Sequence, residues 1–397
     1  MKHLFFLFFL FVGVGYAQKT ANFLPLTSYQ PTDSFEDLKQ IDSIFVGKSI
    51  IGLGESTHGT SEFVVLRHRI FKYLVENHEF NTFFLEADYA ACQRVNRYIH
   101  GSDDNVDSAT NKLLLWPWIT SEMTSLIEWM RVYNFKNGNK LNFVGTDMQL
   151  AKDELPEFER LFSKRPEIID KAIKIDSLLT GKLQFEKQNV NAALSIWKEI
   201  CDDQQKNTSY DWLLTKRSLD QFFQSKEKFY YNFRDSCMAE NIVYYKQLYP
   251  ETKGIYFAHN IHVSKALSRR ANFSDVKRTG TFLSERLGEN YAAFALSTYE
   301  GEFNVLDYVG KQIKPTETSV LYRKFNISRS VEKAFSKTKY SMGYLNANYL
   351  KTNKLYSIVD IGAAIIRKNN YRAIKPTDFN GVFFLRTTTP THLLINR

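Results

Sequence analysis

The feature that most constrains the fold is the apolar run Ser49–Leu53, which stops abruptly at Gly-Glu-Ser-Thr-His-Gly, residues 54–59. A stretch whose apolar residues recur at helical spacing begins directly afterwards. This order predicts a buried strand, a tight glycine turn and the start of a helix. In an open α/β sheet, ligands bind in the crevice at the carboxyl ends of the strands. We therefore expect Glu55 and His58, both in this turn, to lie in a functional crevice.

Five further apolar runs alternate with polar turns and long stretches of helical period. They are Thr82–Leu85, Leu141–Val144, Gly254–Ala258, Tyr291–Leu296 and Gly381–Leu385. Leu355–Val359 is either another strand or the end of a helix. Strands that alternate with helices indicate an α/β fold with a mainly parallel central sheet flanked by helices. We expect Ser49–Leu53 and the first three runs of the list to be parallel neighbours or near-neighbours in this sheet.

The stretch Asp153–Tyr249 breaks this rhythm, because it contains no convincing strand. Its apolar residues recur at helical spacing, as Ile175, Leu178 and Leu179 do. We expect several helices that form an insertion or cap beside the sheet. This cap is either a lid that excludes water from the crevice or a structural side layer. The mature chain, residues 18–397, is expected to be a single domain that carries this cap.

Composition and charge bound the function classes. The chain has 397 residues, 44% of them hydrophobic and 24% charged, which is ordinary for a globular protein. The net charge is +9, but Lys and Arg are scattered among acidic residues, so we do not expect nucleic-acid binding. The three cysteines, Cys92, Cys201 and Cys237, have no CxxC spacing, which supports neither a disulfide framework nor a cysteine zinc site.

The N-terminus is typical of a secretory signal peptide. A short basic start, Met1–His3, precedes the apolar run Leu4–Val14, and small residues lie before Gln18. The run is too short to span a bilayer. We therefore predict that residues 1–17 are removed and that the mature protein is exported to the periplasm or secreted, without stable membrane insertion.

Polar residues follow four of the predicted strands at the point where each strand ends. They are Glu55 and His58, Glu86 and Asp88, Asp147, and His259 with His262. If the strands are parallel, all of these side chains face one crevice. Histidine is the usual general base near neutral pH, and a neighbouring carboxylate orients it and raises its basicity. We expect His58 to be such a base.

Arg67 and the missing serine motif add to this interpretation. Arg67 lies on the helix that follows the glycine turn, where it is able to pair with a carboxylate or stabilise an oxyanion. The alternative for Arg67 is a surface ion pair with Glu62 or Glu76. The chain contains no G-x-S-x-G nucleophile elbow, so a water activated by His58 is the simpler proposal.

Two other function classes stay open at this point. The side chains of Glu55, His58, Glu86, His259 and His262 are of the types that bind zinc, which is compatible with a metal-dependent hydrolase. Neither H-E-x-x-H nor another firm metal spacing is present, so we expect no metal and no cofactor. The other class is a non-catalytic envelope binding protein of the same fold.

The ordered series of motifs resembles the erythromycin esterase family. The matching residues run from about residue 40 to the C-terminus, and the segment 153–227 is the least diagnostic part. They are 54–59, Arg67, Leu85-Glu86, Trp116–Trp118, Glu128–Asn134, Gly145–Asp147, Arg234-Asp235, Met238–Asn241 and His259–His262. The resemblance implies a hydrolase that opens the lactone ester of macrolide antibiotics with activated water and without a covalent serine intermediate.

The resemblance also implies roles for individual residues. The family's general base matches His58, and its supporting residues match Glu55, Arg67, Glu86, His259 and His262. We expect Asp147 to contact the small-molecule ester substrate. Trp116 and Trp118 either line an apolar pocket for a large ring or pack in the core around Pro117.

Overall fold

The computed structural model describes residues 23–394, except for residues 103–104, 139, 150–153, 181–182, 184–185, 228–231, 267, 271–272, 310–311, 350–355 and 366–369. The predicted signal peptide, residues 1–17, lies outside the described residues. Within the described part, no helix combines the length and the apolar composition needed to cross a membrane.

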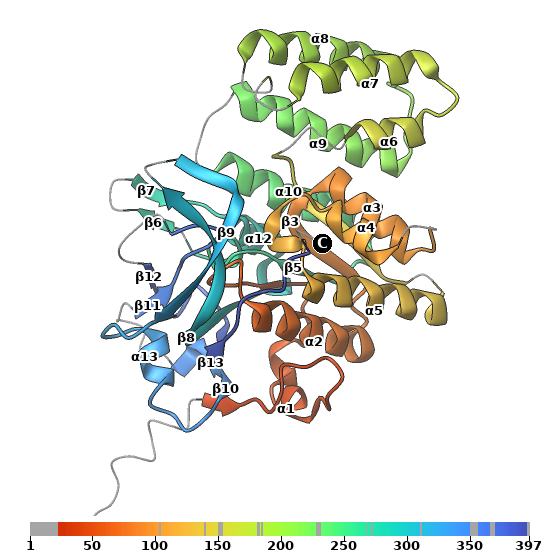
Figure 1. The fold of residues 1–397 in the computed structure, drawn as a ribbon. Helices are drawn as coiled ribbons and strands as arrows, with labels where there is room; N and C mark the ends of the chain where they lie inside the picture. Colours follow the sequence, from red (N-terminus) through yellow and green to blue (C-terminus); the bar gives the residue numbers. More distant parts are fainter. Residues whose placement is uncertain are drawn as a thin grey trace, which may run out of the picture.

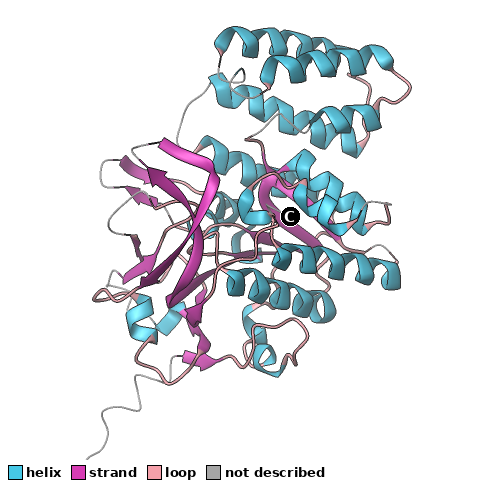
Figure 2. Ribbon diagram, in the orientation of Figure 1, coloured by secondary structure: helices cyan, strands magenta, loops and turns pink. Residues whose placement is uncertain are grey.

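A nine-stranded sheet forms the centre of the molecule (Figures 1 and 2), with the strand order β1-β10-β13-β8-β2-β5-β3-β4 and with β9 paired to β8. Its strands are β1 (Phe23–Pro25), β2 (Ile50–Leu53), β3 (Thr82–Asp88), β4 (Asn142–Asp147), β5 (Gly254–Phe257), β8 (Tyr291–Val309), β9 (Gln312–Lys324), β10 (Met342–Asn346) and β13 (Gly381–Thr388). The strands from β13 to β4 are all parallel, whereas β1, β10 and β9 pair antiparallel at the margins.

The six apolar runs of the sequence form these six parallel strands, which confirms the predicted α/β fold and its mainly parallel sheet. The strands β2, β5, β3 and β4 are adjacent in that order. Leu53 pairs with Phe257, and Phe257 pairs with Leu85, so the carboxyl ends of these strands are level. The turns that follow them therefore meet at one edge of the sheet.

Side chains of the central strands alternate between two apolar cores, one on each face, because successive residues of a strand point in opposite directions. Phe83 and Leu85 face the core built with α2 (Ser61–His78) and α5 (Ser121–Asn137). Phe84 faces the core built with α10 (Phe233–Leu248), α12 (Thr279–Leu287) and α13 (Val331–Phe335). The helix α3 (Tyr89–Ile99) packs beside β4 at the sheet edge. Both faces of the sheet are covered, as expected.

The helical stretch expected over Asp153–Tyr249 divides into two parts. Its first part is α6 (Glu154–Leu161), α7 (Pro166–Leu179), α8 (Lys187–Asp203) and α9 (Tyr210–Glu227). These four helices enclose an apolar core of their own that includes Phe158, Trp197 and Trp212. Figure 1 shows them as a separate group next to α3 and α10. The second part, α10, packs against β4 and α12 and so belongs to the layer that covers the sheet.

The remaining elements are short. Leu355–Val359, which the sequence left open between strand and helix, contains the strand β11 (Tyr356–Val359), and β11 pairs with β12 (Tyr371–Ile374) outside the main sheet. The others are β6 (Ser268–Arg270), β7 (Phe273–Val276), α1 (Glu36–Lys39), α4 (Val106–Asn111), α11 (Asn260–Val263), and the 3₁₀ turns η2 (Asp42–Ile44), η3 (Trp116–Trp118), η5 (Gly288–Asn290) and η6 (Ala347–Tyr349).

Candidate active site

The turn after β2 places Glu55 and His58 at the carboxyl edge of the sheet. The His58 Nδ1 atom lies 2.5 Å from Glu55 Oε1, and the other Glu55 oxygen accepts a hydrogen bond from Arg67. Glu55 and Arg67 are fully buried, and the Arg67 guanidinium lies over the Phe257 ring. A buried carboxylate needs such a compensating charge, since an unpaired charge is costly away from water. Hydrogen bonds therefore link the three side chains in series, from the core to the crevice.

Close packing of two turns fixes this arrangement. The backbone N–H of Asn260, at the start of α11, donates to the carbonyl oxygen of Glu55 at 2.8 Å. A Cβ at Gly54 would lie 2.1 Å from Asn260 Oδ1 and 3.0 Å from Asn260 Cα. Glycine at position 54 is therefore required for the β5–α11 turn to approach the β2 turn.

The environment of His58 favours its protonated form. Burial lowers the pKa of His58, but the charge of Glu55 and its hydrogen bond outweigh burial, so the pKa is raised above the ordinary value of 6.5. Burial lowers the pKa of Arg67 to about 10, which leaves the guanidinium charged near neutral pH. A proton on His58 is thus stabilised by Glu55.

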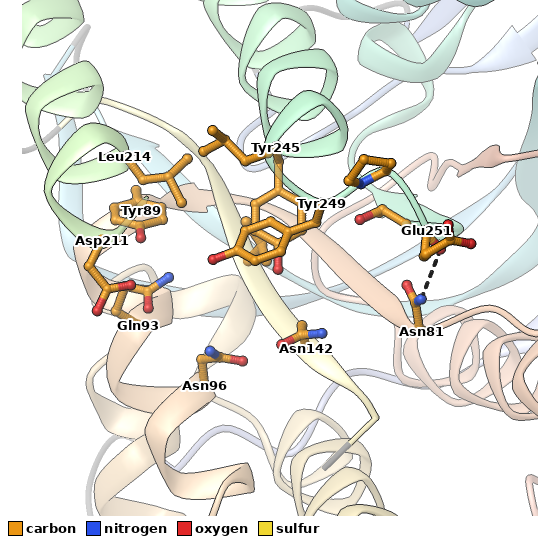
Figure 3. A pocket seen from close by; sticks show the side chains of 14 residues that line it. Asn81, Tyr89, Gln93, Asn96, Asn142, Asp211, Leu214, Tyr245, Tyr249 and Glu251 are labelled. Atoms are coloured by element: carbon orange, nitrogen blue, oxygen red, sulfur yellow. Dashed lines mark hydrogen bonds between the residues drawn. The ribbon is translucent and has the colours of Figure 1, made fainter. Parts of the chain in front are cut away.

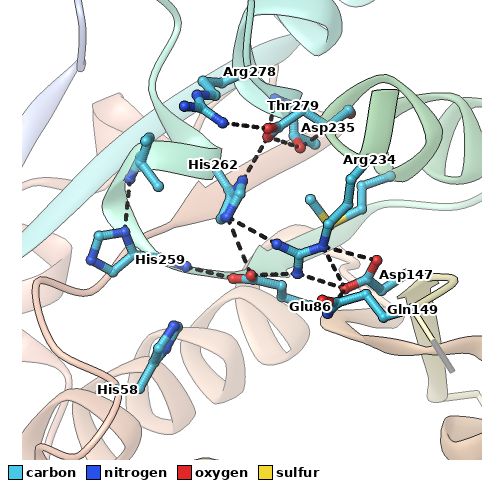
Figure 4. Close-up of polar contacts among 12 residues, drawn as sticks. His58, Glu86, Asp147, Gln149, Arg234, Asp235, His259, His262, Arg278 and Thr279 are labelled. Carbon is cyan, nitrogen blue, oxygen red and sulfur yellow. Dashed lines mark hydrogen bonds and ion pairs between the residues drawn. The ribbon is translucent and has the colours of Figure 1, made fainter. Parts of the chain in front are cut away.

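Glu86, at the end of β3, connects several elements of the site (Figure 4). Its Oε1 atom accepts a hydrogen bond from Arg234 at 2.8 Å and lies 3.3 Å from His262 Nε2. Its Oε2 atom accepts a hydrogen bond from the backbone N–H of His259 at 3.0 Å. Burial raises the pKa of Glu86, but the positive charges of His262 and Arg234 outweigh burial and hold it well below its usual range. Glu86 is therefore a fixed negative charge at the centre of the cluster.

His262 is oriented by a carboxylate from another element. Its Nδ1 atom lies 2.6 Å from Asp235 Oδ1, on α10. Arg278 donates to the other oxygen of Asp235 at 2.9 Å, and Thr279 donates from both its backbone N–H and its hydroxyl. With Nδ1 engaged, the Nε2 atom of His262 faces Glu86 and Arg234 (Figure 4).

Asp147, at the end of β4, contacts Arg234 and not open space. Its Oδ2 atom accepts hydrogen bonds from Arg234 at 3.0 and 2.6 Å and from Gln149 at 2.7 Å. Asp147 is fully buried, whereas the Arg234 side chain is 31% exposed. The structure thus places Asp147 behind Arg234, and the guanidinium is the group that a substrate is able to reach.

His259 lies beside His58 in a different electrostatic environment. The centroids of the two rings are 5.4 Å apart. The His259 Nε2 atom is 3.6 Å from Asp360 Oδ1, and Asp360 also pairs with Arg372 at 2.9 Å. Burial lowers the pKa of His259 to about 4, and Asp360 opposes this shift only in part. His259 is therefore neutral near pH 7.

The segment that carries Asp360 docks directly on the turn after β2. The Ile361 N–H donates to the carbonyl oxygen of Ser56 at 2.9 Å, and the His58 N–H donates to the carbonyl oxygen of Gly362 at 3.1 Å. Gly362 has a φ of +69°, and a Cβ there would lie 3.7 Å from His259 Nε2 and 3.9 Å from His58 Cδ2. Residues 360–362 therefore form one wall of the site, next to both rings.

Glu332 of α13 anchors this wall. Its Oε1 atom accepts hydrogen bonds from Val359 N–H at 2.9 Å and from Ser297 Oγ at 2.5 Å. The side chain is fully buried, and no hydrogen-bond partner of its Oε2 atom is found among the described residues. Burial raises the pKa of Glu332 to about 7, against the hydrogen bonds that favour its charged form. Glu332 fixes β11 one residue before Asp360.

Of the two tryptophans predicted to contact substrate, Trp118 lies against the base. Its ring packs edge-on to His58 at 5.6 Å, and its Nε1–H donates to the carbonyl oxygen of Glu86 at 3.0 Å. Both Trp116 and Trp118 are buried in η3. Trp118 therefore limits the rotation of the His58 ring and contributes to the floor of the site.

Comparison with known proteins agrees with this geometry. The family model described as erythromycin esterase matches residues 75–388. The chain belongs to the erythromycin esterase family. The match begins after the turn at residues 54–59, so family membership does not depend on that motif.

Three relatives of this family member illustrate the range of similarity. It is 25% identical to an erythromycin esterase type II of Escherichia coli, over 70% of this chain and 75% of the relative. It is similar to a solved structure described as a succinoglycan biosynthesis protein, with a TM-score of 0.79, 24% identity, and coverage of 94% and 96%. It is also similar to a mutant of the erythromycin esterase EreC in its open conformation, with a TM-score of 0.71, 18% identity, and coverage of 93% and 98%.

The structure of this family member brings Glu55, His58, Arg67, Glu86, His259 and His262 together at one edge of the sheet. Asp88 lies next to Asp147, in the bulge that ends β3. Sequence reasoning did not assign the partners on other elements. They are Arg234, Asp235, Arg278, Asp360 and Glu332. Arg234 and Asp235 were visible only as part of the family-like segment. Across the residues with described positions, no group of three His, Cys, Asp or Glu side chains is arranged to hold a metal ion.

Proposed function

We propose that this protein hydrolyses carboxylic esters with a water molecule that His58 activates. The observation that carries the proposal is the buried chain of Arg67, Glu55 and His58 at the carboxyl edge of the sheet. Because Glu55 accepts the hydrogen bond from Nδ1, the Nε2 atom of His58 is left free to accept a proton from water. Family membership supports the same reaction class.

The proposed reaction uses two groups of residues. His58 removes a proton from water as the water oxygen attacks the ester carbonyl carbon, and Glu55 stabilises the imidazolium that forms. Negative charge develops on the carbonyl oxygen, and we assign its stabilisation to Arg234, whose side chain is 31% exposed. The tetrahedral intermediate then expels the alcohol oxygen, which takes the proton from His58. The products are an alcohol and a carboxylic acid, which releases its remaining proton to solvent, and no bond to the protein forms.

The substrate class follows from the relatives and is part of the proposal. Two relatives of Escherichia coli are described as erythromycin esterases. A macrolide lactone is therefore the first substrate to test, followed by simpler esters. We also propose that the protein is exported, because residues 1–17 have the pattern of a cleaved signal peptide. N-terminal sequencing of protein recovered from the periplasm and medium checks the export proposal, and an intact Met1 in the cytoplasm would contradict it.

Mass spectrometry in ¹⁸O-labelled water tests the hydrolysis. The mature protein is incubated with erythromycin and a panel of simple esters. We expect erythromycin to gain the mass of one labelled water, and a simple ester to yield an acid that carries one ¹⁸O atom. Loss of turnover in His58→Ala, with turnover kept in His100→Ala, assigns the reaction to His58 and not to histidine in general. His100 is a suitable control because it lies at the end of α3 and its Nδ1 contacts only the local Asn96 carbonyl group.

Three outcomes would contradict the proposed mechanism. Activity that is lost on chelation and restored by zinc would indicate a metal-dependent hydrolase. A protein mass increased by an acyl group would indicate a covalent intermediate. Ligand binding that is unchanged in His58→Ala, with no product from any ester, would indicate a binding protein that keeps the fold.

A further inference from the structure

A cavity of about 380 Å³ lies at the β4 edge of the sheet, away from His58. Four elements form it (Figure 3): α3 and β4 on one side, the start of α9, and the end of α10 with the turn that follows. None of its lining residues belongs to the cluster around Glu86 and His58. The volume is at the lower end of the range for small-molecule sites, which is about 300–1,000 Å³.

Three largely buried side chains present polar atoms to the cavity, and these atoms form no hydrogen bond with the residues that the structure describes. The side chains are those of Tyr89, Gln93 and Tyr245, with exposed fractions of 5%, 8% and 6%. None of these atoms is among the fully buried unpartnered atoms of the described residues, so they reach the space of the cavity. The phenol and amide groups are therefore available to a molecule that occupies the cavity.

The charge of the lining disfavours an anion. The cavity contains the carboxylates of Asp211 and Glu251, and no lysine, arginine or histidine lines it. Asp211 already pairs with Arg160 at 2.9 Å, and Glu251 is exposed to solvent, so the lining holds no buried unpaired carboxylate that would select a cation. Burial and the nearby Asp211 carboxylate raise the pKa of Tyr89 well above its usual range. Its phenol stays neutral, and it is able both to donate and to accept a hydrogen bond.

The remaining lining combines amides with apolar surface. Asn96 and Asn142 also line the cavity, and Asn96 Oδ1 accepts a hydrogen bond from the Phe143 N–H at 2.8 Å, which leaves its NH2 group as a donor. The Gln93 amide carries both a donor and an acceptor, which matches the dual character of a hydroxyl group. On the other side, the rings of Tyr245 and Tyr249 pack 4.7 Å apart and form an apolar surface with Leu214. Hydroxyl-bearing rings present such a pattern, with polar edges and faces made of C–H groups.

We propose that this cavity binds a neutral, hydroxyl-rich ring of the size of one sugar unit. The neutral hydroxyl groups satisfy Tyr89, Gln93 and Tyr245, and the carbon face of the ring packs against the tyrosine pair. This inference is independent of the proposed ester hydrolysis, because it uses none of the residues of that site.

Saturation-transfer NMR with the mature protein tests the inference, with glucose, galactose and N-acetylglucosamine as probes. We expect saturation transfer to at least one of these sugars and a measurable Kd by titration. Tyr89→Phe and Gln93→Leu each remove one hydrogen bond, which corresponds to a loss of affinity of about 2- to 13-fold. The matched control is Tyr98→Phe, on the same helix, whose phenol contacts Glu128 at 2.5 Å outside the cavity. This control should bind the sugar as the wild type does.

Three results would overturn the proposal. The first is the absence of saturation transfer to all three sugars at a concentration of tens of millimolar. The second is unchanged affinity in the double variant Tyr89→Phe/Gln93→Leu. If glucose 6-phosphate bound more tightly than glucose, the ligand class would be anionic and the electrostatic argument would be wrong. The titration requires no ester turnover, so its failure is distinct from a failure of the proposed hydrolysis.

Discussion

His58 and His259 are neighbouring imidazoles, with side chains 12% and 7% exposed, yet their pKa values are displaced in opposite directions. Burial lowers both values, but Glu55 contacts His58 at 2.5 Å, whereas Asp360 lies 3.6 Å from His259 and also pairs with Arg372. Two factors therefore decide which histidine gains a proton: how close its carboxylate lies, and whether that carboxylate also pairs with an arginine. The proposed role of His58 as the base, with a neutral His259 beside it, rests on this difference.

The largest expected effect follows from removing the base itself. His58→Ala should lower kcat/KM by about 10²–10⁴-fold, which is the usual contribution of a general base. His259→Ala should cost less, because a neutral neighbour does not transfer the proton. Steady-state kinetics on the best ester found, with thermal unfolding as a check on folding, measure both variants. Equal losses in the two variants would remove the distinction between the rings.

The pH profile sharpens the comparison next. A base must be neutral to act, so hydrolysis should fall as pH decreases through the pKa of His58, which lies above 6.5. Glu55→Gln removes the charge that raises this pKa, so the inflection should move to lower pH and the rate should decrease. The dependence of kcat/KM on pH between 4 and 9 is the measurement. An inflection near 4 in the wild type would instead match His259.

Glu332, which anchors the wall formed by residues 360–362, is expected to make the free energy of unfolding depend on pH. The pKa of Glu332 is about 7 in the folded protein, above its ordinary value of 4.5, so folding favours the protonated form. Stability should therefore decrease as pH rises from 4.5 through 7, by about 3 kcal/mol in order of magnitude. Glu332→Gln keeps the acceptor for Val359 and cannot ionise. Urea unfolding at pH 5 and pH 8 should show this decrease in the wild type and not in the variant, and a similar decrease in both would exclude Glu332 as its source.

The smallest effect is expected for Asp360→Asn. Asp360 raises the pKa of His259, but that pKa is already about 4, so its loss leaves the charge of His259 near pH 7 unchanged. We expect a change in kcat/KM of less than about tenfold, well below the cost of removing a general base. The inflection of the pH profile should stay in place. A displaced inflection would show that Asp360 acts on His58 as well.

The parts of the molecule that follow from local pattern were predictable. The strands β2, β3, β4 and β5 are apolar runs that end in polar turn residues, and parallel pairing then brings Glu55, Glu86 and His259 to one edge. The partners from other elements were not predictable in this way. Asp235 reaches His262 from α10, and Asp360 reaches His259 because Glu332 holds β11 in place. These contacts depend on how helices dock on the sheet, which no spacing within the sequence specifies.

The same limit explains the placement of Asp147. Its position at a strand end predicted a residue of the crevice, and the strand does end there. Its two oxygens are occupied by Arg234, which comes from a helix far away in the sequence. The sequence pattern located the edge of the sheet correctly, but it did not reveal that the Arg234 side chain covers Asp147.

The contact between Gly54 and Asn260 limits which residues of this protein are able to change during evolution. Any side chain at position 54 would meet not only Asn260 Oδ1 but also Asn260 Cα, so shortening residue 260 does not make room for it. Asn260 is itself tied to the backbone of Leu296 through both its amide atoms. No single substitution at position 54 or 260 is therefore able to change the spacing of the two turns. New substrate ranges have to arise, in evolution or in a directed library, from the surrounding walls, such as η3 and residues 360–362.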